Sequence, residues 1–228
     1  MNFLAMAQRV KRESGRGSTA IAGVLTATGE DLDICNWVAT AWRDIQLMPY
    51  TWAWMRVSII GDLVIDTIAH SPLSLTAANF SKWVPESDDY QMTVYESSAP
   101  ATEWRIQFLP YERFRGRFII GEHSAAAPQF WTQAPHGDFL IGPKPDLGTY
   151  KLRADYFMAP DELTDDTDVP GMPDQFHMLI VWDALMHAAS FDAAPEVHSR
   201  ARDNSEKMLN SLIDHQGEKI KFRFRPFA

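Results

Sequence analysis

Residues whose types could support catalysis are scattered along the chain and match none of the usual catalytic spacings. No G-x-S-x-G nucleophile motif occurs, and no two histidines have the H-E-x-x-H spacing of a zinc protease. The single cysteine, Cys35, lies on the apolar stripe of a predicted helix, where a thiol is normally inert packing. The sequence therefore predicts a protein that is not an enzyme.

Two local patterns resemble ligand sites. The segment GRGSTA at residues 15–20 fits the dinucleotide pattern G-x-G-x-x-A, but that motif works only between a strand and a helix. Here it follows a predicted helix, so we interpret it as a loop. Asp183 and His187 stand four residues apart and could share a metal ion, although such a pair is more often a helix-surface hydrogen bond or a buried polar contact. We therefore expect no cofactor and no metal.

Acidic residues gather in two segments of a chain whose formal net charge is −9. One group loads the first turn of a predicted helix, and the other lacks the glycine and closing glutamate of an EF-hand. We interpret the second group as a solvated acidic loop, with a cation site as the alternative. The two groups are Glu30, Asp31 and Asp33, and Asp161, Glu162, Asp165, Asp166 and Asp168. This charge argues against a protein that grips nucleic acid over its whole surface.

The composition is that of a globular protein with an unusually high content of tryptophan. The 228 residues are 46% hydrophobic and 22% charged, which is enough to bury a core without disulfides or metals. One cysteine excludes an intramolecular disulfide and fits assembly in a reducing cytoplasm. The basic residues near the N-terminus follow the apolar stretch at residues 3–7, whereas those of a signal peptide precede it. No apolar run reaches membrane-spanning length. We therefore expect neither a signal peptide nor a transmembrane segment.

The first 50 residues predict two helices. Asn2 is a plausible cap for a helix that reaches Ser14, because apolar residues recur there at helical spacing. Thr28 and Asp31 form a capping-box-like start for the second helix, and Pro49 ends it. For Trp37 and Trp42 of the second helix, and for Trp182 further along the chain, we expect packing in the core or at a subunit interface.

Helical periodicity returns near residue 173. The segment from Phe176 to Ala189 has hardly any polar face, so other helices must cover it. Pro195 opens a final helix, and Gly217 is well placed to end it.

Between these helical parts the period changes from helical to two. Trp104, Ile106 and Phe108 alternate with polar residues, and residues 150–156 do the same, as half-buried antiparallel strands should. We predict an α+β protein with a four-helix core from both chain ends, an antiparallel β insertion and an extended C-terminal strand. The predicted parts are residues 1–50, 51–160, 161–216 and 217–228.

The C-terminal tail alternates without a fault, which indicates a strand. Its apolar face carries Ile220, Phe222 and Phe224, and its basic face carries Lys219, Lys221, Arg223 and Arg225. The tail can add to the chain's own sheet or pair with the sheet edge of another subunit, and both interpretations stay open.

Three stretches together resemble the head-to-tail adaptor (connector) family of tailed bacteriophages, which includes the tail tubular protein A type. The resemblance covers about half of the chain, in its helical parts, and is weak across the strands. The first stretch comprises FLA at 3–5 with QRV at 8–10, the Gly/Thr-rich loop, WV at 37–38, AWRDIQ at 41–46 and WAWM at 52–55. The second comprises PDQFH at 173–177, LIV at 179–181, AL at 184–185 and AA at 188–189, and the third is ML at 208–209.

The resemblance implies a structural virion protein at the head–tail junction, assembled in the host cytoplasm. Its implied partners are further copies of itself in a dodecameric ring, the portal protein, tail or nozzle proteins, and viral DNA that passes through without specific binding; no membrane is implied. We expect residues 219–225 to bind the portal. We also expect part of the 161–168 cluster, or the acidic turn at residues 30–33, to face the DNA channel, because acids repel phosphate.

Two alternatives remain from the sequence. Another tail or head completion protein would share ring assembly but occupy a different level of the particle. A carbohydrate-acting or carbohydrate-binding protein would use the aromatic-rich β insertion, and it would show exposed, coplanar Trp or Tyr side chains in a groove with two facing carboxylates.

Overall fold

The computed structural model describes residues 1–17, 19–85, 87 and 90–216. Two compact units divide the chain. The helical unit joins Met1–Met55 to the segment that starts at Pro160, and the β unit is Arg56–Ala159. The α+β class predicted from the sequence is confirmed. Within the described residues, no helix is long and apolar enough to cross a membrane.

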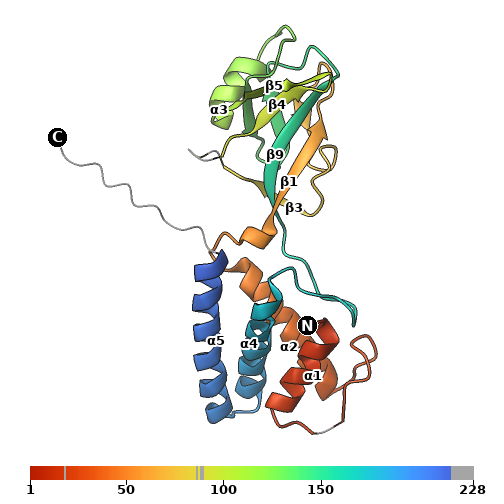
Figure 1. The fold of residues 1–228 in the computed structure, drawn as a ribbon, viewed down its shortest axis with the longest axis vertical. Coiled ribbons are helices and arrows are strands. Elements are labelled where there is room, and N and C mark those ends of the chain that lie inside the picture. Colours follow the sequence, from red (N-terminus) through yellow and green to blue (C-terminus); the bar gives the residue numbers. More distant parts are fainter. Residues whose placement is uncertain (18, 86, 88–89, 217–228) are drawn as a thin grey trace, which may run out of the picture. The chain divides into compact units, whose positions relative to one another are not determined.

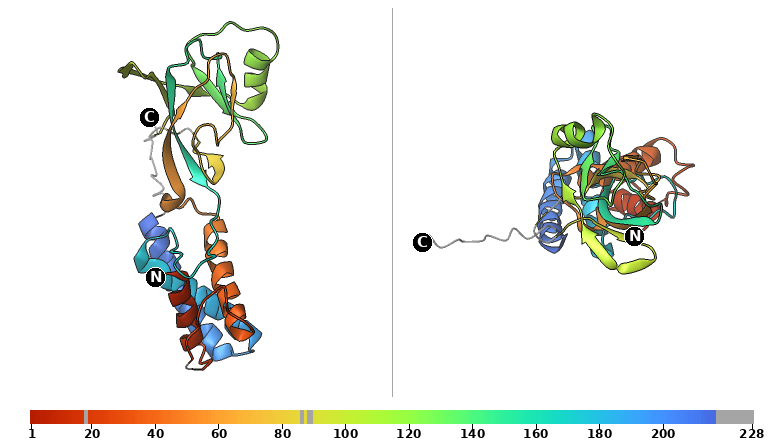
Figure 2. Two further views of the ribbon diagram at one scale, coloured as in Figure 1. Left: turned by 90° about the vertical axis from the view of Figure 1, so that its right-hand side faces the viewer. Right: turned by 90° about the horizontal axis from the view of Figure 1, so that it is seen from above.

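The helical unit is built around one central helix. Its long helices are α1 (Phe3–Glu13), α2 (Glu30–Leu47), α4 (His177–Phe191) and α5 (Pro195–Gln216), with short turns η1 (Ala53–Met55) and η3 (Asp174–Phe176). Helix α4 packs against α1, α2 and α5, and Figures 1 and 2 show it between them. Since α4 is apolar on nearly all sides, this arrangement gives the cover that its sequence demands.

The helix starts were predicted with mixed success. The Asn2 side chain accepts a hydrogen bond from the Ala5 amide at 3.0 Å, so the predicted cap of α1 is confirmed. The predicted capping box of α2 is wrong, because the N-cap is Gly29, with a φ of 58°, and no side chain caps the helix. The three acids in the first turn of α2 still face the positive end of the helix dipole.

One carboxyl group is buried between α4 and α5. Asp183 is 8% exposed, and the Ser205 hydroxyl donates a hydrogen bond to it. Burial raises the pKa of Asp183 to about 6, while the Ser205 hydrogen bond opposes the shift. His187 lies on the same helix, but its ring approaches Asp44 of α2, with a nitrogen–oxygen distance of 3.9 Å. Asp183 therefore makes a buried polar contact with Ser205, whereas the partly exposed His187 ring lies toward Asp44.

The β unit consists of two sheets. The first has the order β1 (Arg56–Asp62), β9 (Tyr150–Met158), β4 (Thr93–Glu96) and β5 (Ala99–Arg105), with β3 (Phe80–Trp83) also paired to β9. The second has the order β2 (Ala69–His70), β8 (Phe139–Gly142), β7 (Phe130–Gln133) and β6 (Gln107–Phe108). All pairs are antiparallel except β6–β7, which is parallel and departs from the predicted antiparallel insertion.

Strand β9 follows its predicted alternation, but the predicted strand around Ile106 is not a single strand. Leu152 and Ala154 point into the core, while Arg153 points out and contacts Glu103 at 3.0 Å. The alternating segment around Ile106 is not one strand, because it leaves the first sheet after β5 and enters the second as β6. Ile106 is buried at this crossover, and Phe108 is therefore exposed instead of buried.

A short helix that the sequence did not predict packs against the second sheet. Helix α3 (Tyr111–Phe114) continues into the π-helical turn η2 (Arg115–Ile119). Phe114 and Phe118 are buried in a small cluster with Ala134 and Leu140. A Cβ on Gly142 of β8 would lie 2.8 Å from the Phe118 ring, so only glycine lets the helix approach the strand this closely.

Asp183 makes stability depend on pH. Its pKa is raised from 3.8 to about 6 in the folded protein, so its stabilising contribution is complete below pH 3.8 and is lost as pH rises through about 6. We expect Asp183→Asn to be more stable than the wild type by about 2 kcal/mol at pH 8, with the difference vanishing near pH 4. Thermal melts of both proteins across this range test it. Asp203→Asn, at an exposed site on α5, is the control, and an identical pH dependence for Asp183→Asn and wild type would contradict the prediction.

Gly142→Ala should loosen α3. The added methyl group overlaps the Phe118 ring, and overpacking of this kind costs about 1–3 kcal/mol of unfolding free energy. Gly116→Ala is the matched control, because a Cβ there meets nothing within 4 Å. Denaturant titration of both variants measures the effect. Equal stability of the two variants would show that the close approach does not hold the helix.

Candidate functional site

Three of the predicted channel residues carry structural contacts. The Lys11 ammonium pairs with Asp31 at 2.6 Å, which joins α1 to α2. The Asp166 carboxylate accepts a hydrogen bond from the Val24 amide at 2.6 Å. The Asp168 carboxylate accepts from the amides of its own turn, which lowers its pKa. Asp31 therefore joins two helices, and Asp166 and Asp168 hold loops of the helical unit in place.

The segment that carries the second acidic group is fastened along the helical unit. The Gln46 side chain exchanges two hydrogen bonds with the backbone of Asp161, both at 3.0 Å. At the other end, the carbonyl of Asp168 accepts a hydrogen bond from the Phe3 amide at 2.8 Å. Burial raises the pKa of the Asp161 carboxyl. The acidic segment is thus a strap that runs from the end of α2 to the start of α1.

The structure brings the two acidic groups to the same side of the helical unit. Cys35 of α2 lies between them: its thiol is buried, and its pKa rises to about 11 through burial and through the charges of Asp31 and Asp166. A thiol with this pKa is protonated and inert, as the sequence predicted. Within the described residues, the side chains of Glu30, Asp33, Glu162 and Asp165 form no ion pair or side-chain hydrogen bond.

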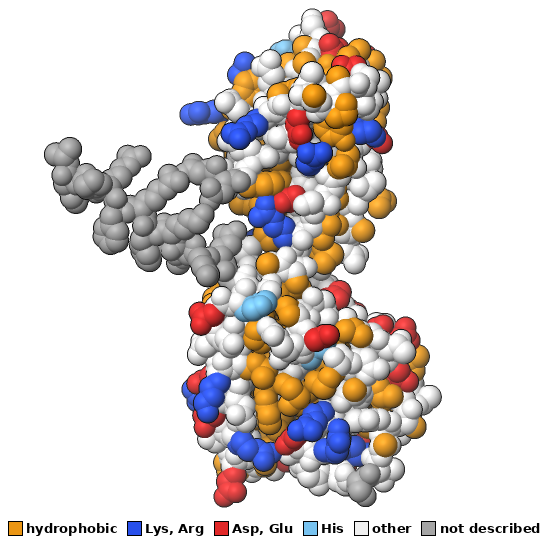
Figure 3. Space-filling model, viewed as in Figure 1, with side chains coloured by type: hydrophobic (Ala, Val, Ile, Leu, Met, Phe, Trp, Pro, Cys, Tyr) orange, Lys and Arg blue, Asp and Glu red, His pale blue; other side chains and the backbone are white. Residues whose placement is uncertain are grey.

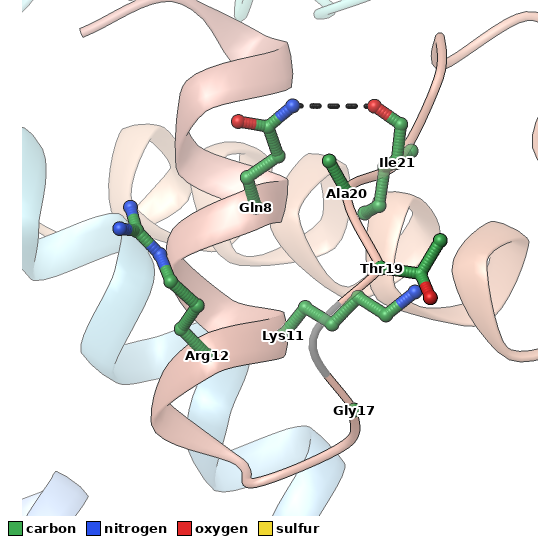
Figure 4. Close-up of a pocket in the computed structure, with 7 residues that line it drawn as sticks. All are labelled: Gln8, Lys11, Arg12, Gly17, Thr19, Ala20 and Ile21. Atoms are coloured by element: carbon green, nitrogen blue, oxygen red, sulfur yellow. Dashed lines mark hydrogen bonds between the residues drawn. The ribbon is translucent and has the colours of Figure 1, made fainter.

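The glycine-rich segment borders a small pocket, and two of the polar side chains that line it bond to other parts of the chain. A cavity of about 190 Å³ lies between α1 and the loop that follows it. Figure 4 shows Gln8 donating to the Ile21 carbonyl, at 3.2 Å, and Lys11 pointing toward Thr19, while Arg12 points away. Because Lys11 is paired with Asp31 and no strand precedes the loop, the segment lacks the geometry of a dinucleotide site.

Metal and sugar sites find no support in the described residues. No three His, Cys, Asp or Glu side chains of that part of the chain gather as a metal site would require. In the β unit Trp83 and Trp131 are buried and Trp104 is half-buried against Tyr150. The tyrosines of this unit are likewise buried or half-buried, so its described surface presents no platform of exposed tryptophan or tyrosine. The observation that the carbohydrate-binding alternative requires is therefore missing from the described surface.

Sequence reasoning missed an arginine-rich surface on α3 and η2. Arg113, Arg115 and Arg117 are exposed, alternating with the buried Phe114 and Phe118 that anchor the helix. Lys and Arg side chains gather over this part of the β unit in Figure 3. Three arginines at every second position were a visible signal, but a period of two predicts a strand, and the helix that presents them is too short for a periodicity argument.

The predicted portal-binding residues, from Lys219 to Arg225, lie outside the described residues. The last described element before them is helix α5, which ends at Gln216.

The family model described as SU10 adaptor protein matches residues 1–223, which include both units. None of the curated proteins matches the chain. Because the match spans nearly the whole chain, including the β unit where the sequence resemblance is weak, the chain belongs to the SU10 adaptor family and is a bacteriophage head-to-tail adaptor protein.

Proposed function

We propose that the protein forms a dodecameric ring beneath the portal, joins the capsid vertex to the tail or nozzle proteins, and lets the genome pass. The match of the adaptor family to residues 1–223 carries this proposal, because it includes the helical core, the β unit and most of the tail. Assembly in the host cytoplasm fits a chain whose single cysteine is buried and unpaired.

Electron microscopy of the purified protein mixed with the portal of the same phage tests the ring directly. We expect a new ring of density on one face of the portal that neither protein shows alone. A protein that stays free, with portal particles unchanged, would contradict the proposal and favour a different level of the tail.

The tail is the proposed portal-binding element. Ile220, Phe222 and Phe224 would fill apolar pockets of the portal, and the alternating basic residues would meet an acidic rim. The helices of the helical unit end by Gln216, so the tail can be removed without cutting them.

Deletion of residues 219–228 should abolish portal binding and leave the thermal unfolding of the protein unchanged. A variant with Ile220→Ser, Phe222→Ser and Phe224→Ser keeps the charges and should also lose binding, because buried aromatic anchors supply most of the affinity in such contacts. Pull-down by the portal measures both. Unchanged binding of the truncated protein would refute the role of the tail.

The proposed channel face is the first turn of α2. Glu30 and Asp33 form no ion pair or side-chain hydrogen bond in the described part of the chain, so their charge is available to repel phosphate within a Debye length of roughly 8 Å. Repulsion keeps DNA from adhering to the wall as it moves. We prefer this pair to Glu162 and Asp165 because Glu162 borders a hollow on the strap whose size and lining suit a protein partner.

Glu30→Lys with Asp33→Lys should slow DNA ejection from assembled particles by roughly tenfold, because each new cation adds a phosphate contact along the channel. The effect should shrink as salt rises. Asp203→Lys on the exposed side of α5 is the control for charge alone. If the Glu30→Lys, Asp33→Lys variant and the control both eject DNA at the wild-type rate, Glu30 and Asp33 do not line the channel.

A further inference from the structure

The arginine surface, defined as Arg113, Arg115 and Arg117 with Ile119 and Ile120, takes no part in the portal or channel contacts proposed above. None of its arginines forms an ion pair with a described residue, which is unusual in a chain with net charge −9. Ile119 is 42% exposed and Ile120 is 61% exposed. Charge and apolar area therefore lie side by side, uncovered.

The surface is rigid enough to recognise a partner. Phe114 and Phe118 are buried against the second sheet, where Gly142 leaves room for them. The Arg117 guanidinium lies 4.5 Å from the centre of the Phe130 ring, so its position is fixed by stacking. A side chain that is already ordered loses less entropy on binding.

The chemistry favours a protein partner over DNA. Arginine beside exposed isoleucine, with no lysine in the patch, is the composition of protein interfaces, where arginine is enriched and lysine is depleted. A phosphate-binding surface has no use for two exposed isoleucines. The partner must present carboxylates and a place for an apolar side chain.

The strap of the helical unit offers both. Glu162 and Asp165 are exposed, and their carboxylates form no ion pair in the described part of the chain. Beside Glu162 lies a cavity of about 220 Å³, which we call the acidic hollow because two of its lining residues are acids. It is lined by Ala39, Thr40, Arg43, Asp161, Glu162 and Leu163. Val169, 54% exposed, adds apolar area further along the strap.

We propose that the arginine surface of one copy docks on the acidic hollow of the next copy, with Arg113 and Arg115 facing Glu162 and Asp165 and an isoleucine entering the hollow. The two surfaces differ, so the contact is head-to-tail, and repetition of such a contact closes a ring when the rotation allows it. This interface rests on the ring proposed above and names the contact that closes it.

Charge reversal in two separate proteins tests the interface. The first variant carries Arg113→Glu and Arg115→Glu, and the second carries Glu162→Arg and Asp165→Arg. Each variant alone sets like charges against each other at every contact. In a ring where the two variants alternate, every contact again pairs opposite charges. The assay counts portal particles that carry a complete ring, by electron microscopy, for wild type, for each variant alone and for the mixture.

Each variant alone should lower the fraction of ringed portals by roughly tenfold or more, because like charges in contact across an interface are strongly disfavoured, and the mixture should restore it. Thermal melts check that both variants fold. If the wild type and both variants form rings to the same extent, the proposed interface is wrong but the ring proposal is supported. Loss of rings that the mixture does not restore would overturn the pairing of these two surfaces. Absence of wild-type rings would overturn the ring itself.

DNA binding is tested with the same proteins. A short DNA duplex that binds the wild type, and binds the Arg113→Glu, Arg115→Glu variant at least tenfold more weakly while rings still form, would assign the arginine surface to phosphate and overturn the proposal.

Discussion

Burial of the apolar helix α4 is the constraint on which the rest of the helical unit depends. No single neighbour can cover a helix that is apolar on nearly every side, and α1, α2 and α5 together do so. Two of these helices come before the β unit in the chain and one comes after α4. The helical unit can therefore form only when both ends of the chain meet, and the β unit is an insertion between them.

The joining of the two chain ends also determines which acidic side chains are used in contacts within the helical unit and which remain exposed. The chain returns from the β unit along α2, fastened by Gln46 at one end and by the amide of Phe3 at the other. Asp166 and Asp168 are used in this fastening, and Asp31 is used in joining α1 to α2. The acidic segment thus has a structural side and an exposed side, and only the exposed side can meet DNA or another subunit.

The parts of the fold that depend on local periodicity were predictable, and the parts that depend on tertiary contacts were not. The apolar stripe of α4 and the alternation of β9 describe one element each, so the sequence alone was sufficient. The crossover at Ile106 was missed, because alternation does not reveal that a strand changes sheets. Helix α3 was missed because its arginines and phenylalanines alternate as a strand would, and packing against Gly142 overrides that pattern. The roles of the acids depend on partners far away in sequence, such as Val24 for Asp166.

Cryo-electron microscopy of the head–tail vertex of the phage particle tests the central claim most directly. We expect this chain to build into a ring of density immediately below the portal, with the β unit of each copy against the strap of its neighbour. Density for this chain at another level of the tail, or on the capsid away from the vertex, would contradict it.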